Sequence, residues 1–180
     1  RWSPDNTKII FSSGTYDTED VYIINSDGSG DPVRLTDWCG ADGSPDISPD
    51  GKTIVWASGG GTCAYDARFL EIYMMNIDGS DKHPLLYEGN PIKGAWVYWS
   101  QDGTQLMINR LSEDGEAWSI YRSDIDGSNL RLIREAATGD AWSPDGSKIL
   151  IRQQLDIWEN TYVMNSDGIG DPVVIADYPT

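Results

Sequence analysis

Aspartate-rich turns are the first residues of this sequence that could do chemistry. Asn25–Asp31, Ser123–Asn129 and Asn165–Asp171 each hold several carboxylate, amide or hydroxyl oxygens. Oxygen ligands at alternate positions can bind calcium; the candidates are Asp27, Asp31, Asp124, Asp126, Asp167 and Asp171. No segment matches the twelve-residue calcium loop with its bidentate glutamate, and Asp-Gly is a strong hairpin signal. We therefore predict structural turns without a cofactor, with calcium as the alternative.

Residues for catalysis are scarce. The chain has one histidine, His83, so a Ser-His-Asp triad would depend on that residue alone. It has no Gly-x-Ser-x-Gly nucleophile elbow, and one histidine cannot form a cluster for a catalytic zinc. Asp17 and Glu19 could be imagined as a glycosidase pair, but nothing in the sequence positions them. We predict that the protein is not an enzyme.

The sequence contains four copies of one repeat, and the secondary structure of these copies must position the residues above. Its first turn reads SPDN, SPDG, SQDG and SPDG, and its aspartates Asp5, Asp50, Asp102 and Asp145 are 45, 52 and 43 residues apart. A tyrosine recurs at one register, at Tyr22, Tyr73, Tyr121 and Tyr162. A period of this length suits a four-stranded propeller blade or a pair of helices.

The apolar segments of the repeat favour strands. They are short, rich in β-branched and aromatic residues, and closed by Gly, Asp and Pro: Ile9–Phe11, Ile54–Trp56, Leu106–Ile108 and Ile149–Ile151. No stretch has helical periodicity over ten residues. We predict an all-β fold, a single β-propeller domain over 1–180 with four four-stranded antiparallel blades. The approximate repeats are 1–36, 37–86, 87–133 and 134–180.

The repeat resembles that of TolB-type β-propellers. The likeness rests on WSPDN-TKIIFSS at Trp2–Ser13 and DVYIINSDGSG at Asp20–Gly30, and it extends over nearly the whole chain. It is also similar to blades of prolyl-oligopeptidase-like serine peptidases. The resemblance implies the blade but not the activity, because family members serve as protein-binding scaffolds, as gates over a peptidase active site and occasionally as lyases.

The two ends of the chain allow two arrangements. Ala176–Thr180 followed by Arg1–Asn6 reads like one uninterrupted repeat. The C-terminal residues would then extend the inner strand of the first blade and close a four-bladed ring. Otherwise the chain is a segment of a larger propeller. The sequence leaves both open.

The net charge limits the classes of partner that the protein could bind, and the two cysteines indicate its cellular compartment. With 13 basic and 29 acidic residues the net charge is −16, which argues against nucleic acid and anionic membranes. No apolar run approaches transmembrane length, so we expect no membrane insertion. In an up-and-down blade, Cys39 and Cys63 fall in loops on the same face. We predict a disulfide between them and hence a periplasmic or extracellular location.

Three long insertions mark the face on which we expect binding. Asp37–Asp46, Gly59–Arg68 and Tyr87–Trp96 lie in connections that emerge on one face of the blades, called here the long-loop face. Loops that vary on a repeating scaffold are where binding usually resides. The expected contacts are Trp38, Tyr65, Arg68, Tyr87 and Trp96.

These features favour a non-catalytic secreted or periplasmic β-propeller that binds a protein or glycan through its long-loop face. One alternative is the gating propeller of a prolyl-oligopeptidase-like serine peptidase without its hydrolase domain. Another is a structural subunit of an extracellular filament or coat. Its compatible ends and exposed outer strands would allow self-assembly.

Overall fold

The computed structural model describes residues 1–15, 18–60, 66–155 and 158–176, and within this part of the chain every regular element is a strand. These residues include no helix that could cross a membrane. The strands form antiparallel sheets in which neighbours along the chain are neighbours in the sheet. The all-β fold predicted from the short apolar runs is thereby confirmed.

Three sheets have four strands each. Within each of these sheets, the first strand follows the connection from the preceding sheet and the second follows the SPDG-type turn. The second sheet contains β4 (Asp42–Ile47), β5 (Thr53–Ser58), β6 (Glu71–Asn76) and β7 (His83–Pro84). The third contains β10 (Trp96–Trp99), β11 (Gln105–Leu111), β12 (Trp118–Asp124) and β13 (Arg131–Glu135). The fourth contains β14 (Ala137–Trp142), β15 (Lys148–Leu155), β16 (Trp158–Asn165) and β17 (Val173–Ala176).

The first sheet departs from the predicted four strands. It contains β1 (Lys8–Ser13), β2 (Asp20–Asn25) and β3 (Val33–Arg34). Where the other sheets have a first strand, this one has a single bridge between Trp2 and Ile9. Only Arg1 and Trp2 precede the turn that starts at Ser3, which is too short a segment for a regular strand. Four strands in every blade are therefore not confirmed.

A two-stranded hairpin separates the second sheet from the third. It consists of β8 (Leu86–Tyr87) and β9 (Asn90–Pro91), joined by Glu88 and Gly89. Both turn residues have positive φ, 51° and 79°, as a tight two-residue hairpin of type I′ requires. The hairpin accounts for part of the long spacing between the second and third repeats.

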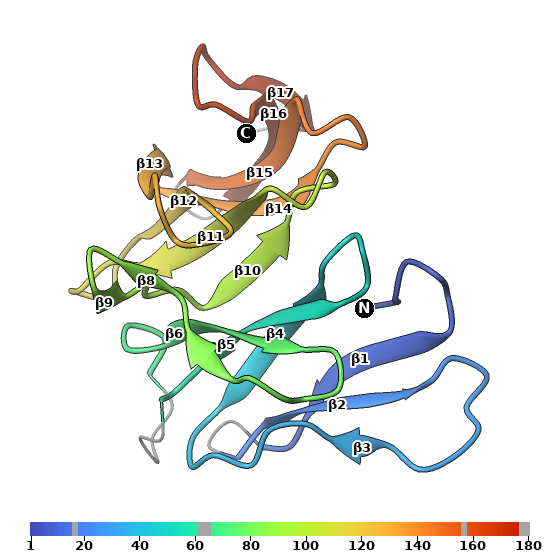
Figure 1. Cartoon of the computed structure of the whole chain (residues 1–180). Helices are drawn as coiled ribbons and strands as arrows, with labels where there is room; N and C mark the ends of the chain where they lie inside the picture. Colours follow the sequence, from blue (N-terminus) through green and yellow to red (C-terminus); the bar gives the residue numbers. More distant parts are fainter. Residues whose placement is uncertain (16–17, 61–65, 156–157, 177–180) are drawn as a thin grey trace.

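The four sheets are stacked in chain order, with the first and the last at opposite ends of the array (Figure 1). The second strands of neighbouring sheets pack through equivalent positions of the repeat. Ile10 of β1 packs with Ile54 and Trp56 of β5, and Met107 of β11 packs in the same way with Ile149 and Ile151 of β15. Each middle sheet is therefore buried on both faces, as the consecutive apolar residues predicted.

The described residues do not close a ring. The last sheet ends at β17, which pairs with β16, and lies far along the array from β1 (Figure 1). Residues 177–180, which were expected to extend the first blade in the closed arrangement, lie outside the described part of the chain. Closure into a four-bladed ring is therefore not confirmed.

The first turn of each repeat has one side-chain arrangement. In the second repeat the Ser48 hydroxyl donates to Asp50 Oδ1 at 2.6 Å and accepts the Thr53 amide at 3.0 Å. Gly51 has a φ of 74°, and Asn6, which replaces this glycine in the first repeat, has 58°. The predicted left-handed conformation of Asn6 is confirmed.

Candidate functional site

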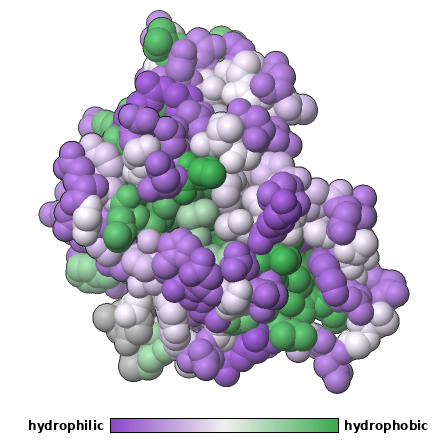
Figure 2. Space-filling view, viewed as in Figure 1, coloured by the Kyte–Doolittle hydropathy of each residue, from purple (hydrophilic) through white to green (hydrophobic). Residues whose placement is uncertain are grey.

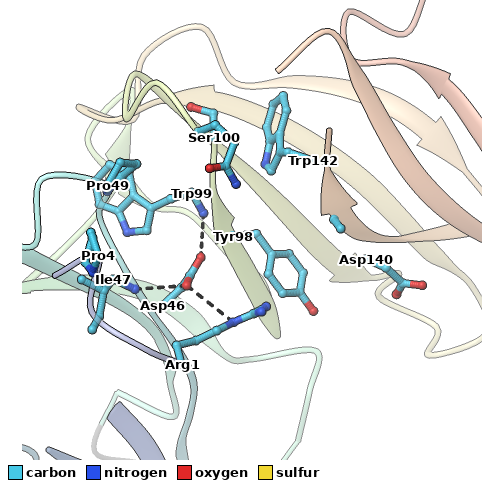
Figure 3. Close-up of a pocket in the computed structure, with 12 residues that line it drawn as sticks. Arg1, Pro4, Asp46, Ile47, Pro49, Tyr98, Trp99, Ser100, Asp140 and Trp142 are labelled. Carbon is cyan, nitrogen blue, oxygen red and sulfur yellow. Dashed lines mark hydrogen bonds and ion pairs between the residues drawn. The ribbon is translucent and has the colours of Figure 1, made fainter. Parts of the chain in front are cut away.

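A pocket of about 390 Å³ opens where the first strands of the second, third and fourth sheets reach their SPDG-type turns (Figure 3). We call it the inner-strand pocket. Its walls repeat the register of the chain, with strand-end residues and turn residues from successive repeats: Ile47, Trp99 and Trp142, then Pro4, Pro49 and Gln101. The repeat therefore brings equivalent positions of different sheets to one concavity.

Asp46 is the central charged residue of this pocket. A bulge in β4 between Gly43 and Asp46 shifts the register against β5. The Asp46 carboxylate accepts the Trp99 amide at 3.0 Å and the Ile47 amide at 3.1 Å. The side chain is 17% exposed, so burial raises its pKa, while the Trp99 amide and the charge of Arg1 oppose that rise. Asp46 thus joins the second sheet to the third.

Arg1 and Tyr98 complete the charged wall. Arg1 Nε lies 3.5 Å from Asp46 Oδ1, and the Arg1 guanidinium lies 5.2 Å from the centroid of the Tyr98 ring. Asp140, on the opposite wall, forms a bidentate pair with Arg152 at 2.7 and 3.0 Å. Arginine and tyrosine are among the residue types that contribute most to binding at protein interfaces.

The pocket also contains two buried indoles. Trp99 and Trp142 are 6% and 9% exposed, and their Nε1 atoms have no hydrogen-bond acceptor within the described chain. A buried N–H without an acceptor costs free energy, which a bound acceptor can recover. The lining therefore combines apolar surface, a carboxylate, a guanidinium and two unused donors.

The described lining contains no nucleophile paired with a base. Ser100 belongs to it, but its hydroxyl donates to Asp102 Oδ1 at 2.7 Å and accepts the Gln105 amide, so the turn uses it fully. His83 lies in β7, is exposed, and its Nδ1 contacts the Asp81 carbonyl oxygen at 2.7 Å. Ser100 and His83 therefore do not form a nucleophile–base pair in this structure.

Three of the residues predicted to make contacts on the long-loop face pack into two different cores of the described chain. Trp38 packs on Tyr73 and Trp56, with ring centroids 4.9 and 6.0 Å apart, in the core between the first and second sheets. Tyr87 and Trp96 pack against the next core, between the second and third sheets. Three of the rings are therefore largely occupied by packing.

Arg68 lies on an exposed turn. Its guanidinium forms a bidentate pair with Asp66 and lies 5.4 Å from the centroid of the exposed Phe69 ring. Tyr65 and Cys63 lie outside the described residues. The disulfide between Cys39 and Cys63 and the contact role of Tyr65 therefore stay predictions, as do the contact roles of the other four residues.

Four of the six turn aspartates considered for calcium accept hydrogen bonds within their own turns. Asp27, Asp126 and Asp167 each accept the amide two residues later, at 2.8 to 2.9 Å. Asp124 accepts the Asn129 amide group at 2.7 Å, and Asp31 and Asp171 are exposed. Across the described ranges, no three His, Cys, Asp or Glu side chains gather as a metal site would require. Calcium binding is not tested by this arrangement.

Asp46 and Tyr98 were not identified from the sequence. They share one register of the repeat, together with Arg1 and Ala141, directly before the recurrent Trp or Ile. The residue type at this register changes from copy to copy while its neighbours repeat. That variation on a constant scaffold is the signal that could have located the pocket.

Comparison with known proteins gives one family. A family model described as the TolB beta propeller domain matches residues 1–171. A protein TolB homolog of Chlorobaculum tepidum is 29% identical over 127 residues, covering 71% of this chain and 26% of its own. A Tol-Pal system protein TolB of Anaeromyxobacter is 28% identical over 108 residues, with 59% and 24% covered. The chain spans from about a quarter to about half of the curated relatives it matches.

Solved structures show the same fold. TolB from Acinetobacter baumannii superposes with a TM-score of 0.72 at 18% identity, over 93% of this chain and 40% of that one. Propellers of proteases are similar in fold as well, with TM-scores of 0.55 and above. At these identities the likeness concerns the fold alone.

Proposed function

This chain belongs to the TolB β-propeller domain family, and we propose that it is a non-catalytic scaffold that binds a protein in the periplasm. A relative named as a Tol-Pal system protein supports a protein partner. The protease propellers among its structural neighbours share the fold, and fold alone does not assign their role to this chain.

The inner-strand pocket is the observation that supports this function. It combines Arg1, Tyr98 and Trp99 in one concavity, and Trp, Tyr and Arg supply most of the binding energy at protein interfaces. Buried Asp46 gives the pocket a fixed carboxylate for a donor of the partner. On the long-loop face, by contrast, Trp38 and Trp96 are engaged by neighbouring rings.

A photo-reactive amino acid at Gln101 would test the proposal. Gln101 lines the pocket, whereas Glu113 is exposed on the long-loop face and serves as the matched control position. In the protein expressed from its natural gene, we expect a discrete cross-linked protein from position 101. Cross-linking from position 113 alone would return the binding site to the long loops. No product from either position would contradict a protein-binding scaffold.

Asp46→Ala gives a second, quantitative test with the partner identified in this way. Removing the carboxylate leaves the Trp99 amide without its acceptor and Arg1 without its ion-pair partner. We expect the affinity to fall by about tenfold or more, since a charge-assisted hydrogen bond contributes roughly 1.5–3 kcal/mol. An unchanged affinity would place the partner elsewhere.

The periplasmic location belongs to this proposal, and glycan binding and self-assembly are alternatives to a protein partner. Each of them can be tested separately. The expected Cys39–Cys63 disulfide requires an oxidising compartment, and cell fractionation tests the periplasmic location directly. A glycan array tests the sugar alternative, and the mass in solution tests assembly into a filament or coat. Sequencing the gene downstream for Gly-x-Ser-x-Gly tests the peptidase gate.

A further inference from the structure

Glu19 occupies a register at which two of the other three copies, the second and the third, place apolar residues. Counted from the recurrent tyrosine, Glu19 corresponds to Leu70 in the second copy and Trp118 in the third. Leu70 is 4% exposed in the core, and Trp118 packs against the same core. The fourth copy has Glu159, whose side chain lies outside the description. A carboxylate at a core register is a local inconsistency of the kind that marks functional sites.

Glu19 lines a cavity of about 290 Å³ at the end of the strands opposite the inner-strand pocket. We call this the loop-end cavity. It lies between the first three sheets, where β4 and β10 begin, and its walls are mostly small: Ala41, Gly43, Ala57 and Ala95. These three alanines are nearly fully buried, at 1 to 4% exposed. Ser12 and Ser44 add hydroxyl groups to the lining, so the cavity combines small residues, polar groups and one acid.

The Glu19 carboxylate is seated on the backbone of Gly43. A Cβ at Gly43 would stand 2.9 Å from Glu19 Oε2, so a residue with a side chain at this position would shift the carboxylate. The Glu19 carbonyl oxygen also accepts the Asp42 amide at 2.7 Å, which fixes this residue against β4. No cation or hydrogen-bond donor of the described chain pairs with the carboxylate, whereas the adjacent Asp20 pairs with Arg34 at 2.7 Å.

Trp96 supplies an aromatic wall to the same cavity. Its indole packs against Trp118 at a tilt of 36°, with ring centroids 4.3 Å apart, and this contact holds the ring in place. An aromatic ring together with an unpaired carboxylate favours a cation. The small residues of the walls favour an unbranched stem over a bulky group.

We propose that the loop-end cavity binds a primary alkylammonium group, with the ammonium on the Glu19 carboxylate and the methylene stem between the alanines and Trp96. The chemistry is that of a lysine side chain of a partner or of a free alkylamine. The net charge of −16 attracts either of them. This proposal is independent of the inner-strand pocket, since the two sites share no lining residue.

Titration with n-butylammonium, followed by the NMR resonance of the Trp96 indole, tests the site. We expect a saturable shift, and a response to neutral n-butanol that is about tenfold weaker because it lacks the charge. A lysine-containing peptide compared with the free amine distinguishes the two sources. Equal binding of the alcohol and the amine, or no saturable shift, would overturn the proposal.

Three variants distinguish a specific role of the Glu19 carboxylate from non-specific effects of the net charge. Glu19→Gln keeps the shape and removes the charge, and we expect binding of n-butylammonium to weaken about tenfold. Gly43→Ala keeps the charge and displaces the carboxylate, so binding should weaken here too. Glu88→Gln, on the exposed β8–β9 turn, should leave binding unchanged. Unaltered binding in Glu19→Gln would refute the assignment, whereas cross-linking at Gln101 should not change in any of the three.

Discussion

Ser48 shows how one side chain fixes a turn of this repeat. Its hydroxyl donates to the Asp50 carboxylate and accepts the Thr53 amide, and the serines and aspartates of the other three turns do the same. The pattern SPDG could be predicted as a turn from the preferences of Pro, Asp and Gly. The serine's double role could not, because it depends on the distance between two strands.

Ser48→Ala should therefore destabilise the second sheet. The substitution removes two hydrogen bonds and leaves a partly buried amide without its acceptor. We expect the free energy of unfolding to fall by about 1–3 kcal/mol. Urea denaturation measures this, with Ser13→Ala, at the exposed end of β1, as the matched control. Equal stability of the two variants would contradict the role of the hydroxyl.

The turn aspartates should make the protein sensitive to acid. The Ser143 hydroxyl and the Ser147 amide and hydroxyl lower the pKa of Asp145 from 3.8 to about 2, and Asp5, Asp50 and Asp102 shift in the same direction for equivalent reasons. Because the folded pKa lies below the unfolded one, the stabilising contribution is complete above pH 3.8. It is lost as the pH falls through the folded value.

Asp145→Asn tests this dependence. The variant lacks the titrating group, so the stability difference between it and the wild-type protein should shrink as the pH falls from about 5 to about 2. Urea midpoints across this range measure the difference. A difference that stays constant with pH would show that the ionisation of Asp145 does not contribute.

At the scale of the element, most strands were predictable and the irregular ones were not. The second and third strands of each sheet follow from apolar runs and the recurrent tyrosine, and Tyr22, Tyr73, Tyr121 and Tyr162 do take equivalent registers. The β8–β9 hairpin was missed because Glu88 takes a positive φ, a conformation that its residue type does not signal. The bulge in β4 that places Asp46 in the inner-strand pocket could not be predicted from the local sequence pattern either.

Asn109 joins two sheets through such an irregularity. It is 1% exposed, its Oδ1 accepts the Gly139 amide at 2.7 Å, and its Nδ2 donates to the Gly139 carbonyl oxygen at 2.8 Å. This pair satisfies the backbone of β14 next to its own bulge. The side chain therefore replaces hydrogen bonds that a regular ladder would have made.

Asn109→Leu should cost the protein substantial stability. It leaves a buried amide and a buried carbonyl group unpaired, and we expect a loss of about 2–4 kcal/mol. Asn90→Leu, on exposed β9, is the control and should change stability by less than about 0.5 kcal/mol. Chemical denaturation of both variants checks the prediction. Similar losses in the two would mean that Asn109 does not connect the third and fourth sheets.

At the scale of the whole molecule, the stack has two sheet faces without a neighbour among the described residues. Val55 and Met107, on the second strands of the middle sheets, are 0% and 1% exposed, whereas Leu150 at the equivalent register of the fourth sheet is only partly buried. Figure 2 shows green apolar surface over the middle and the lower right of the array, whereas the top, where the fourth sheet lies, is mostly hydrophilic in this view. The exposed residues of β17 add to the exposed apolar surface, with Val173 and Ile175 at 61% and 56% exposed.

Paired alanine substitutions measure how far each face is covered. Met107→Ala removes a side chain between two sheets, and we expect a loss of about 2–4 kcal/mol. Leu150→Ala should lower the free energy of unfolding by less than about 1 kcal/mol in the 180-residue chain, because the Leu150 side chain is only partly buried. A cost equal to that of Met107→Ala, together with a larger mass in solution, would show that the last sheet is covered by another copy.

Hydrogen exchange of the protein with and without the partner cross-linked from Gln101 tests the central claim most directly, namely that this propeller binds a protein in its inner-strand pocket. We predict slower exchange at Trp99–Gly103 and around Asp46, with little change at the turn that carries Arg68 and Phe69. Protection confined to the long loops, with the amides of the inner-strand pocket unchanged, would contradict it.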